Sequence, residues 1–125
     1  MSAQQNVAVW FEIPAANFER AVGFYEKVFE TKLTRDKYES SDLAVFPHEG
    51  AGNSGCVMKA DGYKPTREGS VVYLSAGKDL AGPLSRAATN GGSVAIPKTQ
   101  LPDGMGYFAQ FIDSEGNRVG LHSIS

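Results

Sequence analysis

Apolar and polar residues follow strand-like and helix-like spacings in turn, beginning with a run of strand formers at residues 7–12. Pro14 ends this strand, because proline has no N–H to donate to a sheet ladder. Apolar residues then recur at three- and four-residue steps from Phe18 to Phe29, which predicts an amphipathic helix with Asn17 as its N-cap. Three short strands are predicted next, at 32–38, 42–47 and 54–60, with a turn at 49–53 between the last two.

The same order of elements begins again after a loop at 61–69. A strand is predicted at 70–75 and a helix at 80–89, with Asp79 as N-cap and the glycines at 91 and 92 as its stop. Gly82 and Pro83 fit this helix only within its first turn. Strands at 93–97, 107–113 and 118–123 follow, the last two joined by a hairpin turn with glycine at 116.

This repetition, offset by about sixty residues, predicts the fold class. One sheet of this length cannot cover its own apolar face, so we expect the two copies to pack together. The prediction is a single α+β domain over residues 1–125, with module 1 at about 5–61, a linker at about 61–69 and module 2 at about 70–125.

Composition narrows the class of protein without naming a function. The chain is 42% hydrophobic and 21% charged with a net charge of −2, and it has no basic cluster, so we expect no nucleic-acid partner. Its apolar runs are too short to cross a membrane, and residues 1–6 lack the features of a signal peptide. A single cysteine, Cys56, excludes an internal disulfide. We therefore predict a cytoplasmic protein with no membrane partner.

Three segments resemble the vicinal oxygen chelate superfamily, which includes glyoxalase I, extradiol dioxygenases and the bleomycin and fosfomycin resistance proteins. They are WFEIP at 10–14, NFERAVGFYEKVF at 17–29 and GYFAQFIDSEGNRVGLH at 106–122. The chain is most similar to small bacterial glyoxalase-related proteins. The resemblance implies paired βαβββ modules that form a curved eight-stranded mixed sheet around a cleft, with the helices outside. It also implies a homodimer.

Metal-using members of this superfamily place ligands on the first and last strand of each module. Carried over, these positions fall on Trp10, on a place near Cys56 within 55–58, on about Val71 and on Gly120. None offers an imidazole or a carboxylate, which divalent ions need, so no cofactor or metal is expected at the usual site. A divalent metal remains possible only through a displaced layer of Glu12, Tyr73 and His122.

That displaced layer supplies the candidate site residues, because residues two apart on a strand share a face. We predict Glu12 and His122 as catalytic acid–base groups, and as ligand-binding residues Trp10, Tyr73, Met58, Phe46 and Tyr107. Each has a structural alternative: an ion pair for Glu12, a hydrogen-bonded strand position for His122, and packing for the others. The glycine-bracketed segment 102–106 is either a lid over the cleft or an ordinary connector.

Two functions remain open. One is an enzyme of the lyase or isomerase type that acts on a small oxygenated compound through Glu12 and His122. The other is a resistance-type protein that sequesters a planar or aromatic compound without catalysis. Both have a small-molecule ligand, and the fold alone does not choose between them.

Overall fold

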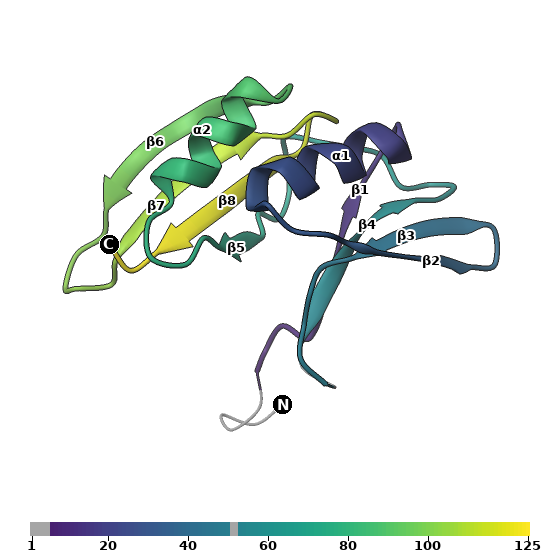
Figure 1. Cartoon of the computed structure of the whole chain (residues 1–125), viewed down its shortest axis with the longest axis horizontal. Helices are drawn as coiled ribbons and strands as arrows, with labels where there is room; N and C mark the ends of the chain where they lie inside the picture. Colours follow the sequence, from purple (N-terminus) through teal and green to yellow (C-terminus); the bar gives the residue numbers. More distant parts are fainter. Residues whose placement is uncertain (1–5, 51–52) are drawn as a thin grey trace.

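In the computed structural model, which describes residues 6–50 and 53–125, two helices cover two four-stranded mixed sheets (Figure 1). Module 1 runs β1 (Trp10–Pro14), α1 (Phe18–Phe29), β2 (Thr34–Tyr38), β3 (Ser41–Val45) and β4 (Ser54–Lys59). Module 2 runs β5 (Tyr73–Ser75), α2 (Ala81–Thr89), β6 (Ser93–Gln100), β7 (Tyr107–Ile112) and β8 (Arg118–Ser123). The predicted α+β fold of two βαβββ modules is confirmed.

The two sheets have the same topology, with strand orders β1-β4-β3-β2 and β5-β8-β7-β6. In each sheet the first strand runs parallel to the last strand of its module, and the other pairs are antiparallel. The ladders do not join into one curved sheet of eight strands. β1 and β5 are both edge strands, and the sheets diverge below the helices (Figure 1).

The first helix forms as predicted. The Asn17 side chain accepts a hydrogen bond of 3.0 Å from the backbone N–H of Arg20, and Glu30 ends the helix in the left-handed region. Its apolar stripe is buried between α2, β4 and the second sheet through Ala21, Val22, Phe24, Tyr25 and Val28. None of the described helices is long and apolar enough to span a membrane.

The second helix begins one residue later than predicted. Pro83 lies in its first turn, where proline removes no intrahelical hydrogen bond, so the expectation for this position is confirmed. Leu80 occupies the N-cap position and makes no side-chain cap. Asp79 precedes it and accepts 2.9 Å from the N–H of Ala81 and 2.8 Å from Lys98. The Lys98 ammonium, followed by the Ala81 amide, lowers the pKa of Asp79.

Several strand ends differ from the prediction. β1 starts three residues later and ends two residues later than expected, and β5 starts three residues later, because the residues before them have no partner strand in the described ladders. β6 continues past Pro97 to Gln100, since it is an edge strand with irregular register around this proline. Of the turn predicted at 49–53, residues 51–52 lie outside the described residues, as do residues 1–5.

One turn, at residues 113–117, joins the modules. Buried Asp113 accepts 2.7 Å from the hydroxyl of Tyr25 on α1, and it also accepts from the N–H groups of Glu115 and Asn117. Burial, followed by the charge of Asp113, raises the pKa of Tyr25 well above its usual value. The Asn117 amide donates 2.8 Å to the carbonyl oxygen of Pro14 at the end of β1. The turn of module 2 therefore fixes both β1 and α1 of module 1.

Glu115 completes this junction at the N-terminus of α1. One carboxylate oxygen accepts from the N–H groups of Ala16 and Asn17, at 3.0 and 2.7 Å, and the other accepts 2.6 Å from Arg20. Burial raises the pKa of this fully covered side chain, but the Arg20 hydrogen bond and the Asn17 amide outweigh burial, so the net pKa is lowered. The carboxylate fills the place where a helix N-terminus favours negative charge.

We predict that Glu115→Gln lowers the free energy of unfolding by about 2 kcal/mol at pH 7, because charged hydrogen bonds are lost at a covered site. A lowered folded-state pKa stabilises the fold above the ordinary glutamate pKa and loses that contribution as pH falls through the folded value. Urea unfolding of the wild type should thus show a loss of stability below about pH 4.3 that is smaller in the variant.

Glu19→Gln is the matched control. Glu19 also forms a bidentate pair with an arginine, Arg35, at 2.7 and 2.8 Å, but both side chains are exposed. Exposed pairs contribute little, so this variant should unfold almost as the wild type does. Equal effects of the two substitutions would contradict the role given to Glu115.

Candidate functional site

We call the sheet β1-β4-β3-β2 of module 1 sheet 1 and the sheet β5-β8-β7-β6 of module 2 sheet 2. Each sheet has one face turned away from the helices, which we call its open face. On sheet 2 the open face carries Tyr73, Phe108, Gln110, Gly120 and His122, because their strand neighbours Leu74, Ala109, Phe111, Val119 and Leu121 pack in the core. On sheet 1 the open face carries Trp10 and Glu12, since Phe11 and Ile13 point toward the core. The predicted sharing of faces within each strand is thus observed.

The ring of Tyr73 lies across Gly120, its register partner on β8. A Cβ atom at position 120 would approach the Tyr73 ring to 2.3 Å, so only glycine leaves room for the aromatic side chain. The Tyr73 ring also makes an edge contact with Phe108, with centroids 6.3 Å apart, and its hydroxyl lies 2.7 Å from the Gln110 amide nitrogen. Tyr73 remains 45% exposed, so the ring is held in place and is still accessible.

A pocket of about 350 Å³ opens beside this ring, lined by Tyr73, Leu101, Phe108 and His122. Its lining is apolar except for the tyrosine hydroxyl and the imidazole. His122 Nε2 lies 2.7 Å from the carbonyl oxygen of Met105. A carbonyl oxygen only accepts, so Nε2 carries the hydrogen and Nδ1 of the neutral ring is an acceptor. Nδ1 has no hydrogen-bond partner among the described residues.

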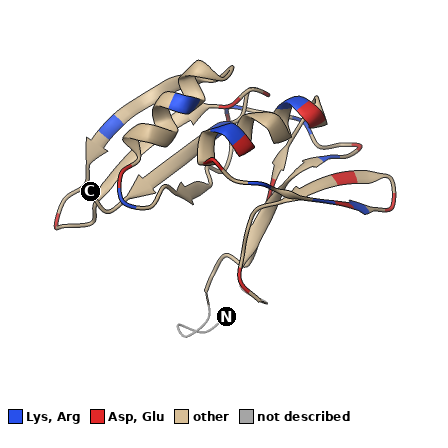
Figure 2. Cartoon of the chain, viewed as in Figure 1, with Lys and Arg blue, Asp and Glu red and all other residues tan. Residues whose placement is uncertain are grey.

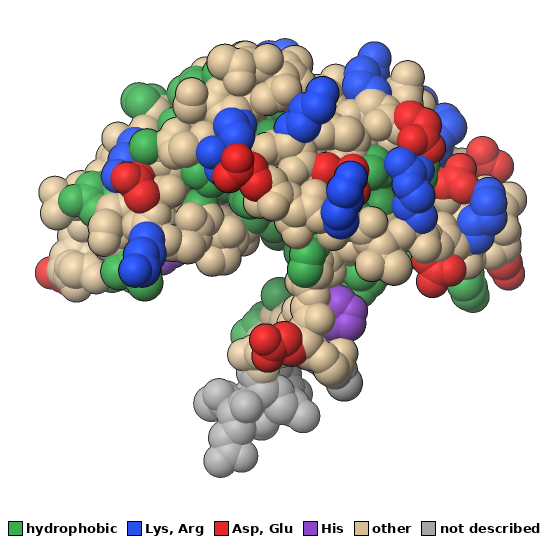
Figure 3. Space-filling model, viewed as in Figure 1, with side chains coloured by type: hydrophobic (Ala, Val, Ile, Leu, Met, Phe, Trp, Pro, Cys, Tyr) green, Lys and Arg blue, Asp and Glu red, His purple; other side chains and the backbone are tan. Residues whose placement is uncertain are grey.

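Tyr73 also lines a second pocket, of about 480 Å³, between the two modules. Its wall from module 1 is aromatic: Phe11, Phe29 and Phe46, with Phe11 and Phe46 centroids 5.6 Å apart. Ser54 and Ser75 supply polar groups at this pocket. Space-filling atoms show a hollow under the body of the molecule, beside the segment that projects below it (Figure 3). The structure thus brings the predicted residues Tyr73, Phe46 and His122 to neighbouring pockets that share one ring.

Glu12 and Trp10 form a separate cluster on sheet 1. The Glu12 carboxylate accepts 2.9 Å from the Tyr63 hydroxyl and 3.3 Å from the Trp10 indole N–H. The hydrogen bond to Glu12 raises the pKa of Tyr63. Among the described residues, Glu12 and His122 share neither a hydrogen bond nor a pocket. The acid–base pair predicted from them is therefore not assembled within one pocket of this chain.

The two clusters occupy equivalent places in the duplicated modules. Ala15 donates to the Met58 carbonyl at the end of β1 as Ala76 donates to the His122 carbonyl at the end of β5, at 2.9 and 2.8 Å. Counting back from these bonds, the register pair Glu12–Cys56 corresponds to Tyr73–Gly120. Burial, followed by the charge of Glu12, raises the pKa of Cys56 to about 12. This thiol is therefore protonated and unreactive at neutral pH.

The other predicted ligand residues lie away from the Tyr73 pockets. Met58 is buried on β4, and Tyr107 lies on the helix side of sheet 2, where the Lys98 ammonium sits 4.7 Å from its ring centroid. Sequence reasoning missed Phe108, Gln110 and Leu101. The hairpin register was the available signal, because the five-residue turn at 113–117 places Phe108 opposite His122 and Gln110 opposite Gly120.

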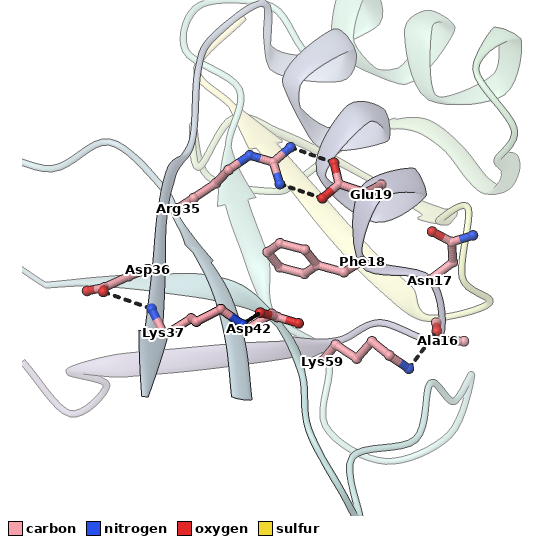
Figure 4. A pocket seen from close by; sticks show the side chains of 9 residues that line it. All are labelled: Ala16, Asn17, Phe18, Glu19, Arg35, Asp36, Lys37, Asp42 and Lys59. Atoms are coloured by element: carbon pink, nitrogen blue, oxygen red, sulfur yellow. Dashed lines mark hydrogen bonds and ion pairs between the residues drawn. The ribbon is translucent and has the colours of Figure 1, made fainter. Parts of the chain in front are cut away.

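Another depression, of about 870 Å³, lies on the helix side of sheet 1 (Figure 4). Its basic side chains are paired: Arg35 with Glu19, Lys37 with Asp42 at 2.7 Å, and Lys59 with the Ala16 carbonyl at 3.0 Å. The Asp36 carboxylate accepts 2.8 Å from the backbone N–H of Lys37. Blue and red segments are likewise interspersed along α1 and the β2–β3 hairpin (Figure 2). Paired, exposed charges on an open surface offer a ligand little, so we place the candidate site at Tyr73 instead.

Sequence comparison agrees with this architecture. The model of the Glyoxalase/Bleomycin resistance protein/Dioxygenase superfamily matches residues 8–121. The chain belongs to this superfamily. The resemblance seen in the three sequence segments is thereby confirmed. No curated protein matches the chain significantly.

Solved structures of superfamily members share the fold at low sequence identity. A glyoxalase/bleomycin resistance protein from Albidiferax ferrireducens is 13% identical with a TM-score of 0.71, over 93% of this chain and 97% of that one. A glyoxalase-related enzyme from Fulvimarina pelagi is 14% identical with a TM-score of 0.67, over 95% and 88%. Glyoxalase I from Zea mays is 17% identical with a TM-score of 0.64, over 93% and 45%, so this chain spans less than half of that protein.

The superfamily positions expected to bind a metal do not fit one in this chain. The Trp10 indole has an N–H and no lone pair that could bind a metal, and the side chains of Val71 and Gly120 have no ligand atom. The Tyr73 ring also covers Gly120. Near the fourth position Cys56 is buried and its raised pKa disfavours the thiolate that a metal requires. In the described parts of the chain, no three His, Cys, Asp or Glu side chains are grouped to hold an ion.

Proposed function

We propose that this superfamily member binds a small aromatic or oxygenated compound at Tyr73, without a metal at the usual superfamily positions. The observation that carries the proposal is the pair of neighbouring, mainly apolar pockets that share the accessible Tyr73 ring. Aromatic rings stack and make edge contacts with such side chains, and a pocket of about 350 Å³ has room for a single-ring compound. A sequestering role of the bleomycin-resistance kind needs no more chemistry than this.

Catalysis of the lyase or isomerase type is a second candidate. It is supported by the Nδ1 atom of His122, an unpartnered base among the described side chains that line the smaller pocket. Glu12 lends no support here, because its carboxylate bonds to Tyr63 and Trp10 on the other sheet. An acid–base reaction at this pocket thus depends on His122 alone.

We also propose that two copies associate. The extended segment before β1 exposes Val7 and Val9 by 75% and 63%, and it projects away from the helices together with the loop after β3 (Figure 1). In the described parts of the chain residues 7–9 have no ladder partner, and unpaired strand-forming residues are prone to pair with another chain. A second copy of this chain supplies a partner of equal length and matching open faces.

A reducing, cytosolic location fits the proposal. The single cysteine is buried, and burial with the nearby Glu12 charge raises its pKa to about 12, so it is poorly placed for a disulfide between chains.

Ligand binding is tested with a panel of single-ring aromatic compounds by NMR titration of EDTA-treated protein. We expect the resonances of Tyr73, Phe108 and His122 to shift while those of Trp10 do not. Tyr73→Ala should weaken binding at least about tenfold through loss of aromatic contact area. Tyr63→Ala is the control, since Tyr63, in the linker between the modules, is similarly exposed, at 38% against 45%. Equal losses for both variants, or a requirement for added metal, would contradict the proposal.

Catalysis is tested by incubating hydroxyketones with the protein in D₂O. A base at His122 Nδ1 should promote deuterium incorporation at the carbon next to the carbonyl, measured by proton NMR. His122→Ala should reduce that rate by about 10²-fold or more, and Glu12→Gln should leave it unchanged. No incorporation above buffer would leave sequestering as the function.

Self-association is tested by size-exclusion chromatography with light scattering. The wild type should elute with the mass of two chains, and the double substitution Val7→Asp with Val9→Asp should shift it toward one. Tyr38→Asp serves as control, because Tyr38 is also 67% exposed but lies on the β2–β3 hairpin. A wild-type mass of one chain at high concentration would refute the dimer.

A further inference from the structure

The hydroxyl of Tyr73 ends a chain of hydrogen bonds whose direction is fixed at its far end. Arg118 Nη1 donates 2.9 Å to Gln110 Oε1, and a guanidinium has no acceptor atom. The atom of the Gln110 side chain that faces Arg118 is therefore the amide oxygen. Its amide nitrogen then faces Tyr73 Oη at 2.7 Å and must donate to it. Tyr73 accepts from inside the protein, and its own hydrogen has no acceptor among the described residues.

Whereas Tyr73 offers a hydrogen-bond donor to a ligand, His122 offers an acceptor. Its Nε2–H is used by the Met105 carbonyl, so the ring offers the acceptor atom Nδ1. The loop before β7 holds this arrangement, because Leu101 N–H bonds to the Gly106 carbonyl at 2.8 Å. A Cβ atom at position 106 would lie 2.3 Å from the Ser123 carbonyl oxygen and 3.1 Å from His122 Nε2, so glycine is needed for this close approach. The segment 102–106 is thus a connector that orients His122.

We infer that the Tyr73 pocket selects planar ring compounds that carry both a carbonyl oxygen and a hydroxyl group. The carbonyl accepts the free hydrogen of Tyr73, the hydroxyl donates to His122 Nδ1, and Phe108 and Leu101 contact the ring. The inference rests on the proposed function and adds the hydrogen-bond pattern of the ligand. A site with directed polar groups discriminates against analogues that leave one of them unpaired.

The probes are the three positional isomers of hydroxyacetophenone, with methoxyacetophenones and ethylphenols as analogues that lack the donor or the carbonyl. Calorimetry should give a Kd for one hydroxyacetophenone isomer about tenfold below that of either matched analogue. Nitrogen-15 NMR of His122 should show the proton on Nε2 in the free protein. A proton on Nδ1, or equal affinities for all three compound classes, would overturn the inference.

Substitutions at Gln110 test the direction of the hydrogen-bond chain from Arg118 to Tyr73 without changing the Tyr73 ring. In Gln110→Glu the new carboxylate accepts from Arg118 and from the Tyr73 hydroxyl, so the preference for the ketone over the ethylphenol should vanish, as it should in Tyr73→Phe. Gln110→Ala is the matched control, because it leaves the tyrosine hydrogen free and should keep the preference. Loss of the preference for the ketone in Gln110→Ala but not in Gln110→Glu would refute this direction of the hydrogen-bond chain.

The outcomes separate the inference from the function on which it rests. Binding of all the ring compounds with equal affinity would retain ligand binding at Tyr73 and overturn the selection rule. Binding of none of them, with the wild type folded, would overturn both.

Discussion

The turn at residues 113–117 is the constraint on which the rest of the structure depends. Three polar side chains of module 2 form hydrogen bonds to the first strand and first helix of module 1: Asp113, Glu115 and Asn117. Each is largely covered, so each bond is made where water cannot replace it at low cost. Because the sheets share no ladder, this junction and the packed helices hold the relative position of the two open faces.

That geometry explains why the two modules contribute different kinds of groups to the candidate site. A sheet edge from each module borders the larger pocket, and the apolar wall of module 1 ends near Phe11 and Phe46. The polar groups that can orient a ligand, in contrast, come from β5, β7 and β8 of module 2. Module 1 shapes the space beside Tyr73, and module 2 supplies the directed hydrogen bonds.

The sequence predicted the elements well where local signals and tertiary packing agree. The Asn17 cap, the spacing of α1 and the hairpin after β7 depend on nearby residues, and all three are observed. The strand at 70–75 was overestimated because Val71 and Val72 favour a strand but find no complete ladder partner. Val72 does accept one hydrogen bond of 2.9 Å from the Gly120 N–H, but the ladder with β8 begins only at Tyr73.

The site was predictable only in part for the same reason. Alternation within a strand correctly grouped His122 with Gly120, and Glu12 with Trp10, but it carries no information on how far two sheets diverge. The prediction that Glu12 and His122 act together depended on the distance between the two sheets, which alternation within a strand does not give. The role of Gln110 depends on Arg118, eight positions later in the chain, and becomes visible only when the hairpin register is drawn.

The equivalence of the pairs Glu12–Cys56 and Tyr73–Gly120 has a consequence for how such a chain can evolve. The two places have the same backbone register but different side chains, a buried thiol opposite Glu12 in module 1 and a glycine under the Tyr73 ring in module 2. Position 120 is restricted to glycine by the ring that covers it, whereas position 56 carries a buried cysteine. The two halves of the repeat have therefore diverged at matching positions, so that one carries the accessible ring of the candidate site and the other encloses the space beside it.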